Sequence, residues 1–135
     1  MHFGIDQVLG NKLAFINVSE TMLLGDVLES LPASKVVLEI LEHVEPTPSI
    51  VARCRQLRER GFRFALDDFV YRPELEPLIA LSDYVKFDVR ALTVTGIAEQ
   101  MRQMRGHSFQ IIAEKVETQE EFRACHALGA NYFQG

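Results

Sequence analysis

Eight polar residues stand at or just beyond the ends of short apolar runs, where packing alone would favour an apolar residue. They are Asn17, Glu39, Asp67, Asp68, Lys86, Glu114, Glu117 and Gln134. Carboxylate and amide oxygens are the hard ligands that Mg²⁺ and Mn²⁺ prefer. The adjacent Asp67 and Asp68 could bridge two ions, a common arrangement for hydrolysing phosphodiesters. A lysine beside them could orient a water molecule or offset phosphate charge, so the set indicates metal-assisted phosphoryl chemistry.

Each residue taken alone has a plainer interpretation. A lone Glu39 at a strand end would be a solvated rim residue. Asp67 and Asp68 could form a turn and a helix cap, and Lys86 could pair with Asp88 at the surface. The set is informative because polar residues recur at six successive strand ends, which is hard to attribute to coincidence.

The elements that must position these residues are visible as alternating patterns. Short runs that are apolar and rich in β-branched or aromatic residues are typical of buried parallel strands. They cover 13–18, 36–40, 62–67, 84–88, 109–114 and 132–134. Helical segments lie between them, since Pro48 suits a first helical turn and Thr118 with Glu121 forms a capping box. Further helices are expected before Gly106 and over roughly 21–31 and 74–81.

Strands that alternate with helices predict an α/β fold with a parallel sheet. In a (β/α) barrel the carboxyl ends of all strands meet at one face, where active sites are built. We therefore predict a partial TIM-like barrel with about six of its eight strands, because a full barrel needs at least ~200 residues.

Composition narrows the function classes further. The chain has 135 residues, and 14 Lys and Arg against 19 Asp and Glu give a formal charge of −5. This balance disfavours a nucleic-acid polymer read through a basic face, whereas bound cations would let an acidic site accept a phosphate ligand. No apolar run approaches the ~18 residues of a membrane span. Cys54 and Cys125 show no ligand or disulfide spacing, which favours a reducing cytoplasm.

Together these residues resemble the EAL family of cyclic-di-GMP phosphodiesterases, in motifs, order and spacing. The resemblance rests on Phe15-Ile-Asn17-Val-Ser19, Leu38-Glu39-Ile-Leu-Glu42, Ala65-Leu-Asp67-Asp68-Phe69, Lys86-Phe-Asp88, Ile112-Ala-Glu114-Lys-Val-Glu117-Thr118 and Tyr132-Phe-Gln134-Gly135.

The resemblance implies a role for each residue of the set. It implies a first Mg²⁺ or Mn²⁺ ion held by Asn17, Glu39 and Asp67. Asp68 would bind a second metal, Lys86 would hold the attacking water, and Glu114 would serve as base or second-metal ligand. Glu117 would pin the neighbouring loop, and Gln134 would contact the site from the last strand. The implied reaction is hydrolysis of cyclic-di-GMP to pGpG.

The chain also departs from the family pattern. The E-A-L strand and the C-terminal helix are missing from residues 1–135, so we interpret the chain as a partial EAL domain. Val70–Leu75 replace a glycine-rich loop, and Lys115 replaces a glycine. The segments around Glu42 and Pro73 resemble EAL domains joined to an HDOD domain, which implies an HDOD-type partner domain. An unclosed sheet leaves two unpaired edges, and a second copy could cover them, so a homodimer is also expected.

Three hypotheses for the function follow. The first is a cyclic-di-GMP phosphodiesterase that is active as a complete barrel, whereas this truncated chain is expected to be inactive alone. The second is a non-catalytic domain that binds the nucleotide or a protein partner. The third is a different barrel enzyme that acts on an anionic substrate.

Overall fold

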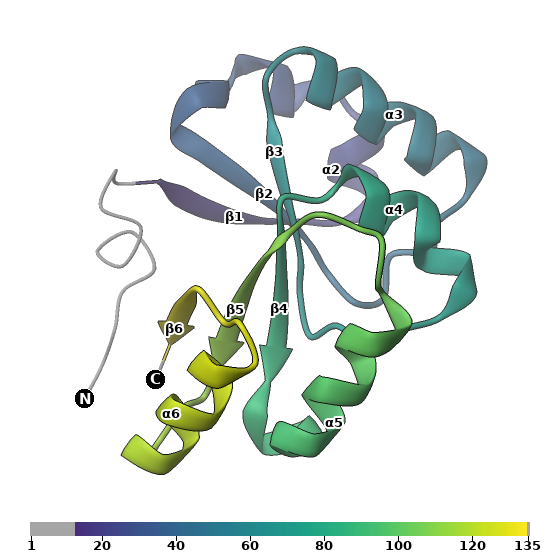
Figure 1. Ribbon diagram of the computed structural model, residues 1–135. Helices are drawn as coiled ribbons and strands as arrows, with labels where there is room; N and C mark the ends of the chain where they lie inside the picture. Colours follow the sequence, from purple (N-terminus) through teal and green to yellow (C-terminus); the bar gives the residue numbers. More distant parts are fainter. Residues whose placement is uncertain (1–12, 135) are drawn as a thin grey trace.

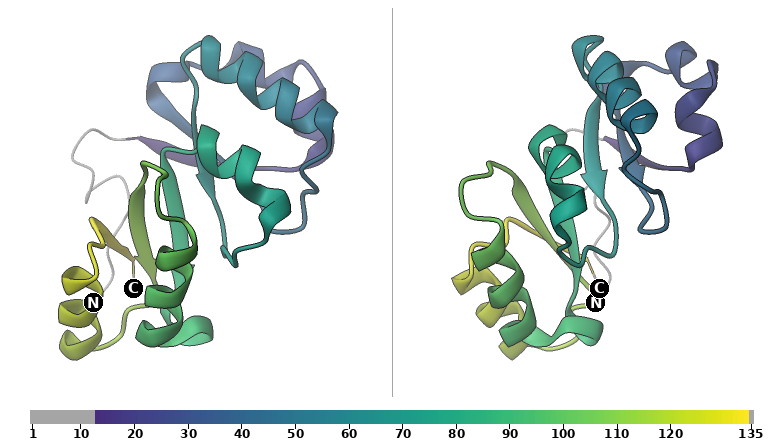
Figure 2. Two further views of the ribbon diagram at one scale, coloured as in Figure 1. Left: turned by 45° about the vertical axis from the view of Figure 1, so that its right-hand side comes forward. Right: turned by 90° about the vertical axis from the view of Figure 1, so that its right-hand side faces the viewer.

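Six parallel strands lie in the sheet in the same order as in the sequence (Figure 1). The computed structural model describes residues 13–134. The strands are β1 (Ala14–Val18), β2 (Val36–Ile40), β3 (Arg63–Leu66), β4 (Tyr84–Asp88), β5 (Gln110–Glu114) and β6 (Tyr132–Gln134). Every neighbouring pair is parallel. The sheet curls, and helices cover its convex side (Figure 2). This is the half-barrel expected from the sequence.

The helices begin and end where local signals place them. They are α2 (Glu20–Leu24), α3 (Pro48–Glu59), α4 (Glu76–Leu81), α5 (Val89–Gln103) and α6 (Gln119–Ala127), with short 3₁₀ turns η1 (Val27–Ser30), η2 (Ala33–Lys35) and η3 (Pro73–Leu75). Pro48 occupies the first turn of α3. The predicted capping box of Thr118 and Glu121 starts α6. These two helix starts are confirmed.

Two helices are less regular than the sequence pattern predicts. The helix expected over 21–31 is divided into α2 and η1, because Gly25 ends α2 in an extended conformation. Within α5, Thr93 has φ 64°, a left-handed value that interrupts the helix with a kink. Among the described residues, no helix is both long and apolar enough to cross a membrane.

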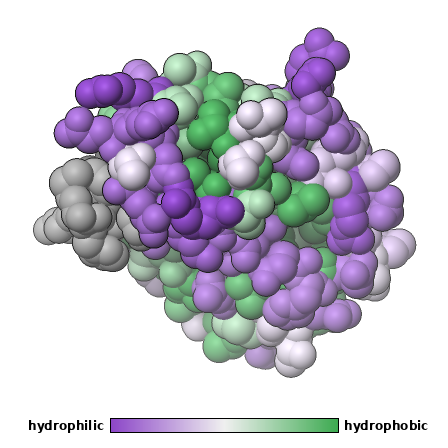
Figure 3. Space-filling model, turned by 90° about the horizontal axis from the view of Figure 1, so that it is seen from below, coloured by the Kyte–Doolittle hydropathy of each residue, from purple (hydrophilic) through white to green (hydrophobic). Residues whose placement is uncertain are grey.

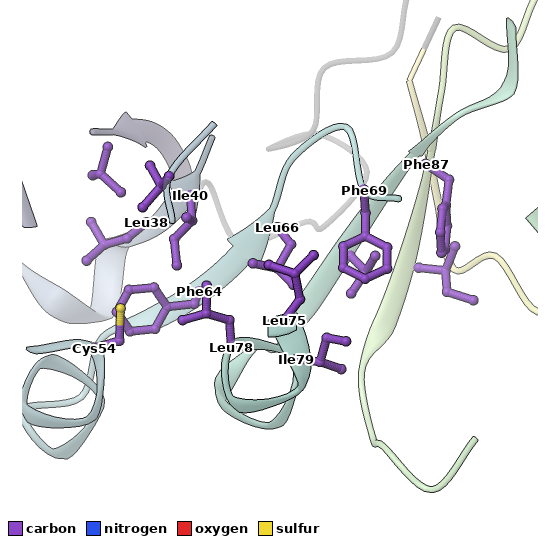
Figure 4. Close-up of a cluster of buried hydrophobic side chains, with 14 of the residues drawn as sticks. Leu38, Ile40, Cys54, Phe64, Leu66, Phe69, Leu75, Leu78, Ile79 and Phe87 are labelled. Atoms are coloured by element: carbon purple, nitrogen blue, oxygen red, sulfur yellow. The ribbon is translucent and has the colours of Figure 1, made fainter. Parts of the chain in front are cut away.

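The two faces of the sheet bury different sets of side chains. Successive residues of a strand point to opposite faces. The convex face packs against α3, α4 and α5 in the main core, where Leu38, Phe64 and Phe87 are fully buried (Figure 4). A second, smaller cluster lies on the concave face, made of Leu13, Val37, Ala65, Tyr84 and Ile112 with Phe15 and Tyr132.

Candidate active site

The concave face changes from apolar to polar at one level of the sheet. On each of the six strands, a polar residue follows two positions after an apolar residue of the smaller cluster. These polar residues are Asn17, Glu39, Asp67, Lys86, Glu114 and Gln134. Since side chains repeat every two residues along a strand, all six share the concave face. The strand register pairs Asn17 with Glu39, and Glu114 with Gln134.

Lys86 lies at the centre of this polar layer. Its ammonium donates a hydrogen bond to Glu39 Oε1 at 2.9 Å, and it lies 3.7 Å from Glu114 Oε2 and 4.0 Å from Asp67 Oδ1. Lys86 is 5% exposed and Glu39 is 6% exposed. The interpretation of Glu39 as a solvated rim residue and of Lys86 as part of a surface pair is therefore wrong. One buried cation faces three carboxylates from three other strands.

The crowding of carboxylates shifts their protonation. Burial raises the pKa of Glu114 to about 7; Lys86 opposes this shift, while Asp67 and Glu39 add to it. Burial and the neighbouring Glu39 raise the pKa of Asp67 to about 6, again against the effect of Lys86. Burial acts to lower the pKa of Lys86, but the surrounding carboxylates outweigh it, so its pKa is raised and the ammonium stays charged. The layer carries more negative charge than one lysine balances.

Two buried oxygens in the layer have no hydrogen-bond partner. They are Oε1 of Glu114 and Oε1 of Gln134. Buried polar atoms are normally paired, so each unpaired one needs an explanation such as a bound ion. An oxygen-rich donor set with surplus negative charge fits Mg²⁺ or Mn²⁺. The residues present therefore fit a divalent cation.

A second acidic cluster lies beside the polar layer and shares Asp67 with it. Glu42, Asp67 and Asp68 each offer an oxygen, and these atoms lie within 4.8 Å of one another. The pattern of polar residues at strand ends did not include Glu42, although its position three residues after Glu39 was a signal. A pocket of about 230 Å³ adjoins this cluster, with apolar walls that include Leu41 and Phe69. Seen from below, the surface shows hydrophobic areas bordered by hydrophilic atoms (Figure 3).

Glu117 lies outside these clusters. Its side chain is 63% exposed and pairs with Arg90 at 2.9 Å. Arg90 also contacts Glu121 of the α6 capping box. Glu117 thus connects the loop after β5 to the start of α5, and among the described residues its carboxylate forms no ion pair with Lys86.

Two residues next to the site have left-handed backbones. Asp68 has φ 45° and Lys115 has φ 61°. Lys115 forms an ion pair with Asp88 at 2.8 Å. The Asp88 side chain is 7% exposed and caps α5 by accepting from the backbone N–H groups of Arg90 and Ala91. Asp88 therefore pairs with Lys115 rather than with Lys86. This pair ties the end of β4 to the loop that follows Glu114.

A curled parallel sheet with carboxylates and a buried lysine on its concave face defines a (β/α)-barrel type of protein with an acidic site. The chain belongs to the EAL domain family, whose pattern matches residues 11–135. It is 32% identical over its whole length to the cyclic di-GMP phosphodiesterase CdgJ of Vibrio cholerae. The chain spans about a third of the length of the first two curated relatives, 32% and 34%.

Solved structures share the fold. The EAL-domain protein YkuI of Bacillus subtilis, in complex with cyclic-di-GMP and calcium, superposes with a TM-score of 0.70 at 20% identity over 96% of this chain and 38% of that one. Klebsiella pneumoniae BlrP1, in a manganese and cyclic-di-GMP complex, gives 0.72 at 22% identity over 96% of this chain and 39% of that one.

Proposed function

We propose that this chain takes part in the metal-dependent hydrolysis of cyclic-di-GMP to linear pGpG. The observation that carries the proposal is the polar layer, in which Lys86 faces Glu39, Asp67 and Glu114, and buried oxygens of Glu114 and Gln134 lack partners. The name of CdgJ and the cyclic-di-GMP complexes of YkuI and BlrP1 support this substrate.

The layer offers one residue to orient the attacking water and another to take its proton. The water oxygen bonds to phosphorus, the bond from phosphorus to the 3′ oxygen breaks, and that oxygen takes a proton from solvent. Lys86 orients the water from its buried position, and Glu114 takes the water's proton. A general base works best when its pKa lies near the working pH, and the pKa of Glu114 is about 7.

We assign Asn17, Glu39 and Asp67 to a first Mg²⁺ or Mn²⁺ ion, and Asp68 to a second. Such ions stabilise the charge that develops on phosphoryl oxygens. Gln134 contacts the site through its unpaired Oε1, and Glu117 positions the loop after Glu114 through Arg90. The manganese and calcium complexes of the structural neighbours support a divalent ion.

The alternative of a non-catalytic scaffold finds less support, because a domain without catalysis has no structural need for a buried lysine among carboxylates. An HDOD-type partner domain, a homodimer and a cytoplasmic location stay predictions. Size-exclusion chromatography with light scattering tests the homodimer directly.

The experiment that tests the function is a hydrolysis assay on the purified complete barrel, the form in which our first hypothesis expects activity. Cyclic-di-GMP is incubated with Mg²⁺ or Mn²⁺, and pGpG is separated by anion-exchange chromatography. We expect pGpG from the wild type and at least ~100-fold less from Glu114→Gln, because a positioned general base contributes roughly 10²- to 10⁴-fold.

The control is Glu120→Gln, which neutralises an exposed glutamate on α6. It should retain the wild-type rate. If the wild type binds cyclic-di-GMP with Ca²⁺ but releases no pGpG with either metal, the scaffold hypothesis replaces the hydrolase.

A further inference from the structure

The segment that carries Asp67 and Asp68 has a strained backbone. Asp68 adopts φ 45°, a left-handed conformation that Asp tolerates better than most residues with a Cβ atom but that still costs energy. Such a conformation persists only when surrounding contacts determine it. The contacts that hold residues 67–75 therefore decide where both carboxylates lie.

Two contacts fix the segment next to the sheet. Asp67 donates its backbone N–H to the Ile40 carbonyl, and Phe69 donates its own to the Lys86 carbonyl, both at 3.0 Å. The Phe69 ring is buried and packs edge-on against Phe87, with ring centres 6.0 Å apart (Figure 4). The chain on either side of Asp68 is thus tied to β2 and β4.

Tyr71, further along the segment, fixes it to helices α4 and α5. Its backbone N–H donates to Gln100 Oε1 of α5 at 2.5 Å, and its hydroxyl donates to Glu76 Oε1 of α4 at 2.5 Å. The second oxygen of Glu76 pairs with His107 Nε2, beyond the end of α5. We call Tyr71, Glu76, Gln100 and His107 the Tyr71 latch.

We propose that the Tyr71 latch holds Asp67 and Asp68 in the conformation that binds the metal, so that Tyr71 is a positioning residue for the site. This inference rests on the proposed function. The latch joins residues 67–75 to α4 and α5 within a single chain. A preformed loop removes the cost of ordering it when the ligand binds. If the latch opens, only a fraction of molecules is competent, and the apparent affinity falls by that fraction.

The experiment compares the full chain with Tyr71→Phe, which removes only the hydroxyl, and with Gln100→Ala, which removes the acceptor for the Tyr71 N–H. The matched control is Glu74→Gln, an exposed residue of the same segment outside the latch. Mn²⁺ alone is the probe, and its affinity is measured by electron paramagnetic resonance of the free ion. Hydrogen exchange of the amides of 68–72 and the melting temperature are measured in parallel.

We expect Tyr71→Phe and Gln100→Ala to weaken Mn²⁺ binding by about tenfold, the size of a lost hydrogen bond to a charged or buried group. Exchange of the 68–72 amides should quicken, and Glu74→Gln should match the wild type in both readouts. A residue with a merely structural role would lower the melting temperature and leave the Mn²⁺ affinity of the folded protein unchanged.

Three results would count against the inference, and each shows a different part of the argument to be wrong. If the wild type binds no Mn²⁺, the proposed function fails and the latch has no metal site to position. If Asp67→Asn binds Mn²⁺ as tightly as the wild type, the ion lies elsewhere and both fail. If the wild type binds, Asp67→Asn does not, and both latch variants bind like the wild type, only the inference about Tyr71 is overturned.

Discussion

At the scale of single residues, Lys86 holds together three carboxylates that would otherwise repel one another. Replacing it with the similarly long Met leaves Glu39, Asp67 and Glu114 without their cation. We expect Lys86→Met to lose roughly 3–5 kcal/mol of unfolding free energy at pH 8, because breaking a buried pair leaves uncompensated charge. Urea unfolding measures this loss.

The same variant should lose less stability at pH 5, because Asp67 and Glu114, with pKa values of about 6 and about 7, are then largely protonated. The control is Lys35→Met, at an exposed position outside the site. An equal loss at both pH values would show that Lys86 stabilises the fold by packing rather than by charge.

The protonation of Glu114 predicts how stability changes with pH in the metal-free protein. Its folded-state pKa of about 7 lies above the ordinary value of 4.5, so folding favours the protonated form. This stabilisation is complete below about pH 4.5 and is lost as the pH rises through about 7. Melting temperatures between pH 5 and 8 should fall with pH in the wild type and fall less in Glu114→Gln.

Mn²⁺ should oppose this loss, because metal ions compete with protons for the same oxygens and bind more tightly as the pH rises. The variant Glu120→Gln should keep the wild-type pH profile. A wild-type melting temperature that rises steadily from pH 5 to 8 without metal would contradict the raised pKa of Glu114.

At the scale of elements, the start of α6 is coupled to the loop after β5. The Thr118 side chain accepts from Glu121 N at 3.1 Å, and Glu121 reaches back to the Thr118 N–H in the capping box. Loss of such a cap costs about 1 kcal/mol. We expect Thr118→Ala to lower the unfolding free energy by that amount, as measured by urea denaturation.

The comparison variant is Thr95→Ala, at an exposed position within α5. Alanine is the better helix former there, so this variant should be neutral or slightly more stable. If both variants lose the same free energy, the effect of Thr118→Ala comes from helix composition and not from the cap.

At the scale of the whole molecule, the six strand ends meet in one polar layer, so a ligand bound to this layer should stabilise the entire fold. We expect cyclic-di-GMP with Ca²⁺ to raise the melting temperature of the chain. A ligand at about 100 times its dissociation constant stabilises the folded state by roughly 2.7 kcal/mol. Differential scanning calorimetry measures the shift, and Asp67→Asn should reduce or abolish it.

The controls are the same melts with Ca²⁺ alone and with cyclic-di-GMP alone. Shifts that require both ligands would show that the metal and the nucleotide share one site. A wild-type transition that does not move with any combination would contradict nucleotide binding by the described strands.

Local patterns in the sequence were sufficient to predict the alternation of strands and helices. Hydrophobic runs, Pro48 at the first turn of α3 and the capping box of Thr118 act within a few residues, so their effects are readable without the fold. The polar residues at strand ends were equally visible, and parallel topology placed six of them on one face. The chain order and motifs that resemble the EAL family are likewise properties of the sequence.

Only the tertiary structure decided which side chains touch. The curl of the sheet brings Lys86 within 2.9 Å of Glu39, 47 residues away in the chain, and leaves Glu117 with Arg90. It also adds Glu42 to the cluster of Asp67 and Asp68, and it links Tyr71 to Gln100 and Glu76. Such contacts depend on strand register, sheet curvature and helix packing together. These are set by the burial of the whole core, and no local pattern of residues encodes them.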